Sequence, residues 1–332
     1  MTTTDISKIN IRQWDCLAQQ ATATSWFQTY EAYSFYSSLP HLFFPFVFAQ
    51  LTDSTLNGVI VGYITKDPNP LKDFFSRRAI IIGGPLLSDK ITNEELKELL
   101  NITRQTLADK AIYIETRNFN DYSKRKNVFR ECGFKYEEHY NFHIDCSNLD
   151  LLESNLGKGR KRDIKTSLRD GATVIEHPDN QQIKDFYDIL ANLSKTKVKT
   201  PLFPFEFFEK LSQVRSAHFL LVEYKGEILG GTVLTGLQSR ALYEWFVCGK
   251  DNAYSSIYPS QLATYSGMRY AAEHNYPLFD MMGAGVPDEP YGVRDFKARF
   301  GGKLVEHGRY LCINNKILYK IGTYAVKILK RL

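Results

Sequence analysis

The chain has 332 residues, of which 43% are hydrophobic and 24% charged, and its 22 Phe and 20 Tyr make it too aromatic for an intrinsically disordered protein. Its length is about that of two average domains. The net charge of +5 favours anionic partners without requiring a nucleic acid. No apolar run reaches the roughly 18 residues of a membrane span, and residues 1–5 lack the basic and apolar regions of a signal peptide. We therefore expect a cytoplasmic location, either free in the cytoplasm or at the inner face of the membrane.

Cysteine and histidine are too scattered to suggest a metal or redox site. The five cysteines are odd in number and far apart, which favours buried free thiols over a disulfide framework or a Cys-x-x-Cys site. His139 and His143 fall in a strand-like run rather than on one helix face. No Gly-x-Ser-x-Gly or Walker sequence is present, and no Gly-x-Gly-x-x-Gly follows a strand. We expect neither a metal nor a tightly bound cofactor.

The first half of the chain alternates predicted strands with helices. Thr92 followed by Glu95 is typical of a capping box, and it opens a helix that runs to about Ala108. Four strands are predicted from β-rich stretches at 46–50, 59–65, 78–83 and 111–116. This alternation favours an α/β domain with a mixed sheet.

A basic segment, Leu149 to Arg169, follows and is predicted to form a helix or helix pair that ends at Gly171. Its cationic side chains outnumber its acids near the C-terminal end. One interpretation is an ordinary solvated face, and the other is binding of phosphate or an RNA backbone. The candidates for the second role are Arg160, Lys161, Arg162 and Lys165.

The second half repeats the order of the first. Strands are predicted at 219–223, 228–235, 240–248 and 277–281, with a helix that begins near Pro259 and Ser260. At a constant offset of 168 residues, Cys132–His139 aligns with Phe300–His307, and Gly58 and Gly62 align with Gly226 and Gly230. A shared offset in two separate segments indicates a duplicated domain. The predicted division is a first domain at 1–147, a basic linker helix at 148–171 and a second domain at 172–332.

The C-terminal segment, Asn315 to Leu332, carries apolar residues at helical spacing and lysines elsewhere. It is predicted to be an amphipathic helix. Packing on the second domain is one role for it, and contact with an anionic lipid surface is the other.

The most informative stretch lies between Phe279 and Gly302. Asp280 ends a strand, a loop rich in glycine and proline follows, and a short helix then presents Lys297. The 168-residue offset aligns Lys297 with Phe129, so a position that is apolar in one half is cationic in the other. A lysine near a reacting carbonyl stabilises a developing oxyanion, and Asp280 would orient that lysine or an attacking amine. The alternative is an exposed helix residue next to a capping carboxylate.

Several short motifs, taken in order, resemble those of the Fem family, the peptidoglycan-bridge aminoacyltransferases. They are Ser25–Tyr30 in the first half and Arg162–Val174, Gly226–Gly236, Tyr258–Leu262, Phe279–Asp280 and Phe296–Gly302 in the second. The likeness covers nearly the whole chain. It implies two GNAT-like acyltransferase domains in tandem, each an α/β unit with a mixed sheet flanked by helices.

The resemblance also implies a reaction, the transfer of an amino acid from aminoacyl-tRNA to an amine of a peptidoglycan precursor or lipid-linked sugar. Lys297 matches the family lysine that stabilises the tetrahedral oxyanion. Where the family grips phosphates with a lysine and an arginine, this chain has Tyr36 shortly after Gln28 and the run Lys195–Thr200. The implied substrate-binding residues are Gln28, Tyr36, Lys197, Lys199, Tyr243, Trp245, Tyr258, Gly283 and Phe296.

Two alternatives stay open. The basic segment is too short for the coiled-coil insertion that some family members use toward tRNA, which leaves an acyl-CoA-dependent N-acyltransferase acting on an amino sugar or other small amine of a cell-envelope polysaccharide. The usual CoA loop is missing as well, and its nearest match, Ser154–Gly159, lies in the linker. The second alternative is a non-catalytic binding protein of the same fold. The presence of Lys297 and Asp280 favours an enzyme over this alternative.

Overall fold

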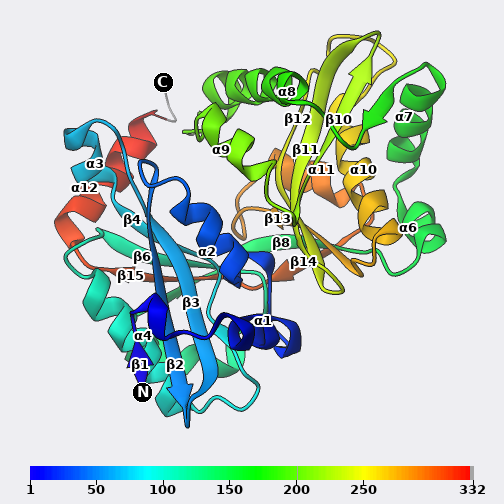
Figure 1. Ribbon diagram of the computed structural model, residues 1–332. Helices are drawn as coiled ribbons and strands as arrows, with labels where there is room; N and C mark the ends of the chain where they lie inside the picture. Colours follow the sequence, from blue (N-terminus) through cyan, green and yellow to red (C-terminus); the bar gives the residue numbers. More distant parts are fainter. Residues whose placement is uncertain (200, 330–332) are drawn as a thin grey trace. The chain divides into compact units, whose positions relative to one another are not determined.

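The computed structural model describes residues 1–199 and 201–329, and for Val198 and residues 325–329 it describes the backbone only. Two compact units make up the chain (Figure 1). Among the described residues, unit 1 comprises 1–139 and 306–329, and unit 2 comprises 140–199 and 201–305. Each unit is built around one mixed β-sheet. In the described residues, no helix is long and apolar enough to cross a membrane.

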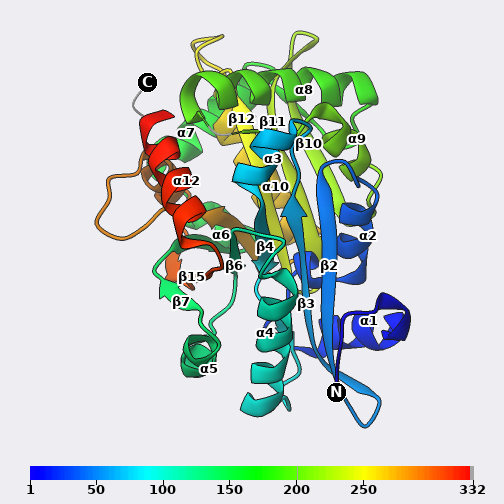
Figure 2. The ribbon, with the colours of Figure 1, turned by 90° about the vertical axis from the view of Figure 1, so that its left-hand side faces the viewer.

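Unit 1 is a sheet in the order β1-β2-β3-β4-β6-β15-β7, with β5 paired to β3. Leucines of α4 and Val128 and Phe129 of α5 pack on one face of this sheet, and α2 packs on the other (Figure 2). The capping box of Thr92 and Glu95 is present at the start of α4, as predicted. The strands are β1 (Thr2–Thr3), β2 (Phe43–Thr52), β3 (Thr55–Thr65), β4 (Arg78–Gly83), β5 (Leu86–Leu87), β6 (Tyr113–Asn118), β7 (Lys135–Glu137) and β15 (Arg309–Ile313). The helices are α1 (Ile11–Gln20), α2 (Tyr30–Ser37), α3 (Pro70–Ser76), α4 (Asn93–Leu107), α5 (Lys126–Glu131) and α12 (Lys316–Leu329).

Unit 2 is a sheet in the order β14-β8-β13-β12-β11-β10-β9. The helices α6, α7 and α10 share a hydrophobic core with one face of it, and α8 and α9 pack together over the other (Figure 1). The strands are β8 (Tyr140–Asp145), β9 (Thr173–Ile175), β10 (Ala217–Tyr224), β11 (Glu227–Leu237), β12 (Ala241–Gly249), β13 (Leu278–Gly283) and β14 (Lys303–Glu306). The helices are α6 (Leu149–Asn155), α7 (Lys158–Arg169), α8 (Asn180–Leu193), α9 (Phe205–Leu211), α10 (Pro259–Glu273) and α11 (Gly292–Ala298).

The two units repeat the same succession of elements, in agreement with the sequence repeat. The hairpin β2–β3 corresponds to β10–β11, β4 to β12, α4 to α10, β6 to β13 and α5 to α11. The aligned glycines Gly133 and Gly301 both end a short helix with a positive φ, at 86° and 81°. A non-glycine residue is strained in that left-handed region, so the glycines mark the same chain reversal in both halves.

The last strand of each repeat lies in the other unit's sheet. After β7 the chain enters unit 2, where β8 pairs antiparallel with β13. After β14 it returns to unit 1, where β15 pairs antiparallel with β6. The predicted boundary at 148 and the assignment of residues 306–329 to the second domain are therefore corrected. Strand exchange of this kind depends on pairing between residues far apart in sequence, which local patterns do not reveal.

The C-terminal helix forms as predicted, but it belongs to unit 1. Tyr319 of α12 packs edge-on against Tyr113 of β6, with 5.3 Å between ring centroids. The expectation that this helix packs on the second domain is thus wrong. The predicted helix end at Leu332 lies outside the described residues.

Candidate active site

The sheet of unit 2 opens between two parallel strands. β12 and β13 pair only where Ala241–Tyr243 meets Leu278–Asp280, although both strands continue beyond this point. The corresponding strands of unit 1, β4 and β6, pair along all of Arg78–Gly83 and Tyr113–Asn118. Backbone groups of β12 that face the opening have no β13 partner in the described pairing, and buried backbone groups need hydrogen bonds. The opening is therefore a place where an amide-bearing ligand can bind.

Asp280 stands at the point where the two strands separate. Its side chain is fully buried and one carboxylate oxygen accepts a hydrogen bond of 2.6 Å from the backbone N–H of Met282. The other oxygen accepts from the amide of Asn141 at 3.2 Å and lies 3.2 Å from Nε2 of His143. Both partners are on β8. Asp280 thus ties β13 to β8 at the position where the β13 register shifts.

Lys297 binds the same irregular stretch through its backbone carbonyls. It lies on α11, only 7% exposed, and its ammonium group donates to the carbonyls of Met281 and Gly283, the latter at 2.8 Å. A longer contact of 3.4 Å reaches the carbonyl of Met282, whose φ of 58° is left-handed. That backbone geometry costs roughly 1–2 kcal/mol in a non-glycine residue. Asp280 and Lys297 bind the backbone groups on either side of Met282 and so stabilise it.

Glu244 on β12 is the second carboxylate of the site. It is 4% exposed, and its carboxylate lies close enough to Lys297, Thr232 and Thr264 for each to lower its pKa. Burial outweighs them and raises the pKa of Glu244 to about 7. Among the described residues neither carboxylate oxygen has a partner in hydrogen-bond geometry. Glu244 is thus a carboxyl group that changes charge near neutral pH.

The same surroundings also shift the pKa of Lys297. Burial lowers the pKa of its ammonium group, while the carboxylates of Glu244 and Asp280 raise it. Within the described chain, no group of three or more His, Cys, Asp or Glu side chains is arranged to hold a metal ion. The chemistry that the cluster can perform is proton transfer by Glu244 and charge stabilisation by Lys297.

Of the predicted site residues in unit 2, Tyr243 and Gly283 adjoin this cluster. Tyr243 is buried and pairs with Asp280 across the strands, and the Gly283 carbonyl is bound by Lys297. Trp245 packs edge-on against Phe207, and Tyr258 precedes α10 with its backbone N–H donating to Ser167 at 2.9 Å. Sequence reasoning missed Glu244, Asn141 and His143. For Glu244 a signal existed, because it is the one charged residue in the apolar run Ala241–Cys248.

Arg160 is buried and is not the solvent-facing phosphate ligand that the sequence predicts. It is 6% exposed, and its guanidinium lies 4.4 Å from the ring centroid of Phe296 and 4.9 Å from that of Phe300. It also donates to the Phe296 carbonyl at 3.3 Å. Arg160 therefore fastens α7 to the segment that carries Lys297. Arg162 and Lys165 are exposed on α7, and Lys161 is half-buried.

The remaining predicted residues lie elsewhere. Gln28 is fully buried in unit 1, where its amide donates to the Gly84 carbonyl at 3.0 Å and its oxygen accepts from Ser25 at 2.9 Å. Tyr36 is buried in an aromatic cluster with Phe43 and Tyr63. Both side chains serve the core of unit 1, which corrects the expectation that they contact substrate. Lys197 and Lys199 are exposed at the end of the π-helical turn Ser194–Val198.

Comparison with known proteins assigns the fold. Residues 158–297 match the family described as an acetyltransferase (GNAT) domain. The chain has a Fem-like tandem GNAT fold. The crystal structure of FemX superposes with a TM-score of 0.74 at 16% identity, covering 97% of this chain and 99% of FemX. No curated protein matches the sequence.

Two further structures share the tandem arrangement. The C-terminal domain of a protein described as a lysylphosphatidylglycerol synthetase, from Agrobacterium fabrum, has a TM-score of 0.60 at 16% identity and covers 96% of both chains. A tandem GNAT protein from the clavulanic acid biosynthesis pathway has a TM-score of 0.56 at 9% identity, covering 95% of this chain and 98% of the other. The matched segment contains Asp280, Glu244 and Lys297, so the acyltransferase domain is the one that holds the open strands.

Proposed function

We propose that the chain is an aminoacyltransferase that joins an aminoacyl group to an amine of a cell-envelope precursor, either a peptidoglycan precursor or a lipid-linked sugar. The observation that carries the proposal is Glu244, a buried carboxyl with a pKa of about 7, set beside Lys297 in the opening between β12 and β13. The FemX and lysylphosphatidylglycerol synthetase structures support the class of reaction by their fold.

The proposed reaction assigns proton transfer to Glu244 and charge stabilisation to Lys297. The acceptor amine attacks the carbonyl carbon of the donor ester, and Glu244 takes the proton that the nitrogen loses as the N–C bond forms. The ester C–O bond then breaks, and the departing oxygen receives that proton from Glu244. Lys297 stabilises the intermediate oxyanion, which would replace the weakest of its contacts, the 3.4 Å contact with Met282.

The start of α10 bears on the identity of the donor. Helix N-termini attract anions, and the phosphates of nucleotide ligands often bind there. Here the Asp251 carboxylate fills that position, accepting from the backbone N–H of Ser260 at 3.0 Å. A second anion, such as the pyrophosphate of CoA, would be repelled. This arrangement argues against CoA phosphates at this helix and leaves aminoacyl-tRNA as the proposed donor, although the acetyltransferase description of the matched domain keeps acyl-CoA as the second candidate.

The test measures product formation with both donors. Purified protein is incubated with labelled aminoacyl-tRNA or acetyl-CoA and with a peptidoglycan precursor or an aminosugar lipid, and amide products are identified by mass spectrometry. We expect product from aminoacyl-tRNA that is lost in Glu244→Gln and Lys297→Met. Glu227→Gln removes an exposed carboxylate of the same sheet and is the matched control. Binding of donor without turnover by the unmodified protein would instead identify a silent binding protein.

A further inference from the structure

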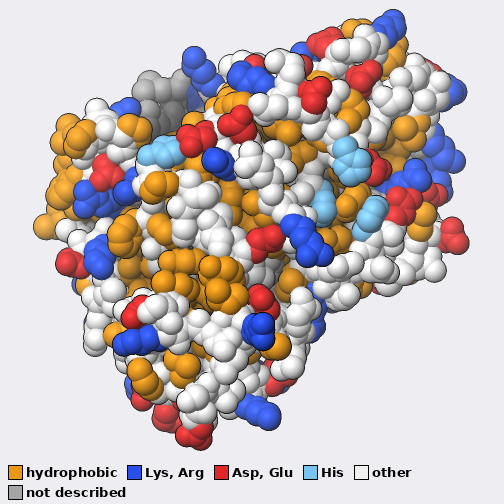
Figure 3. All heavy atoms as spheres, in the orientation of Figure 1, with side chains coloured by type: hydrophobic (Ala, Val, Ile, Leu, Met, Phe, Trp, Pro, Cys, Tyr) orange, Lys and Arg blue, Asp and Glu red, His pale blue; other side chains and the backbone are white. Residues whose placement is uncertain are grey.

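Two neighbouring helices of unit 1 expose an unusual number of large apolar side chains. We call them the α3–α12 surface, which consists of Leu71, Phe74 and Phe75 on α3 and Ile317, Ile321 and Tyr324 on α12. Their exposed fractions range from 44% to 73%. The two helices contact each other, and Figure 3 shows hydrophobic side chains at the edge of the molecule where they lie. These six are nearly half of the large hydrophobic residues that the described chain exposes.

The exposed stripe of α12 is turned away from the residue that anchors the helix. Ile317, Ile321 and Tyr324 follow one another at spacings of four and three residues, which places them on one helix face. Tyr319 packs on Tyr113 of the sheet instead. An amphipathic helix normally buries its apolar stripe, so this one lacks a covering partner in the described chain.

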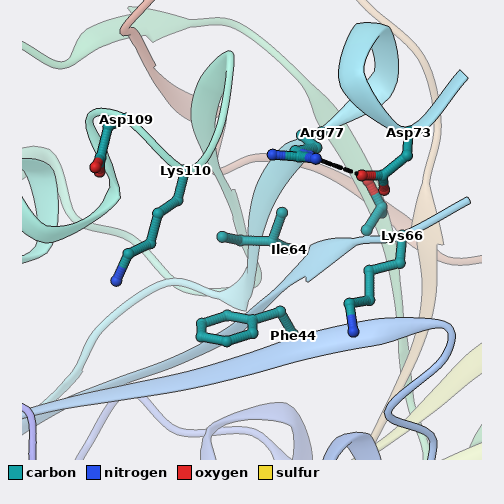
Figure 4. A pocket seen from close by; sticks show the side chains of 8 residues that line it. Phe44, Ile64, Lys66, Asp73, Arg77, Asp109 and Lys110 are labelled. Atoms are coloured by element: carbon teal, nitrogen blue, oxygen red, sulfur yellow. Dashed lines mark hydrogen bonds and ion pairs between the residues drawn. The ribbon is translucent and has the colours of Figure 1, made fainter. Parts of the chain in front are cut away.

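A pocket next to α3 has a small excess of positive charge, because Lys66, Arg77 and Lys110 line it together with Asp73 and Asp109. It has a volume of about 350 Å³, and Figure 4 shows Phe44 and Ile64 between Lys66 and Lys110. The Lys110 ammonium lies 5.8 Å from the centroid of the Phe44 ring, which is 47% exposed. Arg77, at the end of α3, is paired with Asp73 at 2.7 Å. The two lysines therefore stand beside an exposed aromatic ring at the margin of the apolar surface.

The charge of the whole region identifies the kind of partner. Residues 64–78, 109–110 and 316–324 contain seven lysines and arginines against three aspartates. Apolar side chains bordered by basic ones suit the boundary between the headgroups and acyl chains of an anionic bilayer. A second copy of this chain, meeting the same surface by twofold symmetry, would bring like charges together. We propose that the α3–α12 surface binds anionic phospholipid membranes, with Lys66 and Lys110 contacting headgroup phosphates.

The test is co-sedimentation of the full chain with vesicles of phosphatidylcholine alone or with about 30% phosphatidylglycerol, and it needs neither donor nor acceptor substrate. The double variant Phe74→Ser/Ile321→Ser removes two side chains that are each 51% exposed. Its control, Leu151→Ser/Leu168→Ser, removes two side chains that are 46% and 44% exposed on unit 2. We expect binding to the anionic vesicles that falls about tenfold or more in the first variant and is unchanged in the control.

Charge reversal tests the role of the basic side chains beside the α3–α12 surface. Lys110→Glu should weaken binding to anionic vesicles at least about fivefold, and Lys225→Glu on an exposed turn of unit 2 should not. Circular dichroism and thermal unfolding establish that each variant is folded. The proposal is overturned if the unmodified chain does not sediment with anionic vesicles, or if both double variants lose binding equally. The proposal is also overturned if the unmodified chain is a dimer that does not bind vesicles and the variant Phe74→Ser/Ile321→Ser is a monomer. The surface would then bind a second copy of the chain.

Discussion

Replacing Glu244 by glutamine should stabilise the protein in a way that depends on pH. The pKa of Glu244 is about 7 in the fold against an ordinary value of 4.5. The folded chain therefore keeps a proton that the unfolded chain releases, so the free energy of unfolding falls as the pH rises between these values. Each pH unit of that interval is worth about 1.4 kcal/mol. The Glu244 carboxyl thus lowers the free energy of unfolding by about 3 kcal/mol at pH 8 and by almost nothing below pH 4.5.

Glutamine has the same shape and does not ionise, so Glu244→Gln should match the unmodified protein at pH 4.5 and exceed its stability at pH 8. With about 2.1 cal/mol/K of unfolding entropy per residue, 3 kcal/mol corresponds to about 4 °C in Tm if the whole chain unfolds together and about 9 °C if unit 2 unfolds alone. The assay is thermal unfolding followed by circular dichroism at both pH values, with Glu227→Gln as the control. A difference between the two pH values below about 1 kcal/mol would refute the reasoning, because Glu244 would then ionise like an exposed carboxyl.

Three other predictions concern the remaining charged groups. Lys297→Met should lower kcat about 100-fold or more, since removing a single donor that stabilises an oxyanion has that effect, and the check is single-turnover transfer. Arg160→Met should lower the free energy of unfolding by about 2 kcal/mol, because it removes the ring contacts and the hydrogen bond of the guanidinium. The salt dependence of tRNA binding should stay unchanged in this variant, whereas Lys165→Ala should reduce the slope of that dependence. Glu115→Gln should have the opposite pH dependence to Glu244→Gln. Burial raises the pKa of Glu115, but Arg117 and Arg309 outweigh it and hold the pKa at about 2. The stabilisation of about 3 kcal/mol, present above pH 4.5, is then lost as the pH falls toward 2, which urea titrations at several pH values would measure.

Local sequence patterns predicted several of the elements and two residues of the candidate site, Asp280 and Lys297. The capping box at Thr92, the strand Arg78–Gly83 and the helices of the basic segment all form where the residue types predict them. Comparing the halves also drew attention to position 297. Phe129 and Lys297 both point into their units, so the alignment detected a cation placed where its counterpart is a core ring.

The rest depends on contacts between residues far apart in the chain. Nothing in the run Lys158–Arg169 distinguishes Arg160 from its neighbours, and only the packing of Phe296 and Phe300 against it explains its burial. Gln28 and Tyr36 are polar residues near a recognised motif, yet their groups are used by the core of unit 1. The exchange of β8 and β15 is also invisible to local patterns, because it depends on pairing of β8 with β13 and of β15 with β6, which are far apart in the sequence.

The most direct test of the account is the pH dependence of kcat/KM for aminoacyl transfer by the unmodified protein and by Glu244→Gln. If Glu244 is the general base, its ionisation should add to kcat/KM a rise of about tenfold per pH unit below pH 7 that levels off above it, because only the ionised carboxylate accepts the amine proton, whereas ionisation of the acceptor amine affects both proteins alike. The variant should lose both that rise and most of the activity. A Glu244→Gln protein with full activity and the same pH profile would contradict the assignment of Glu244 as the base.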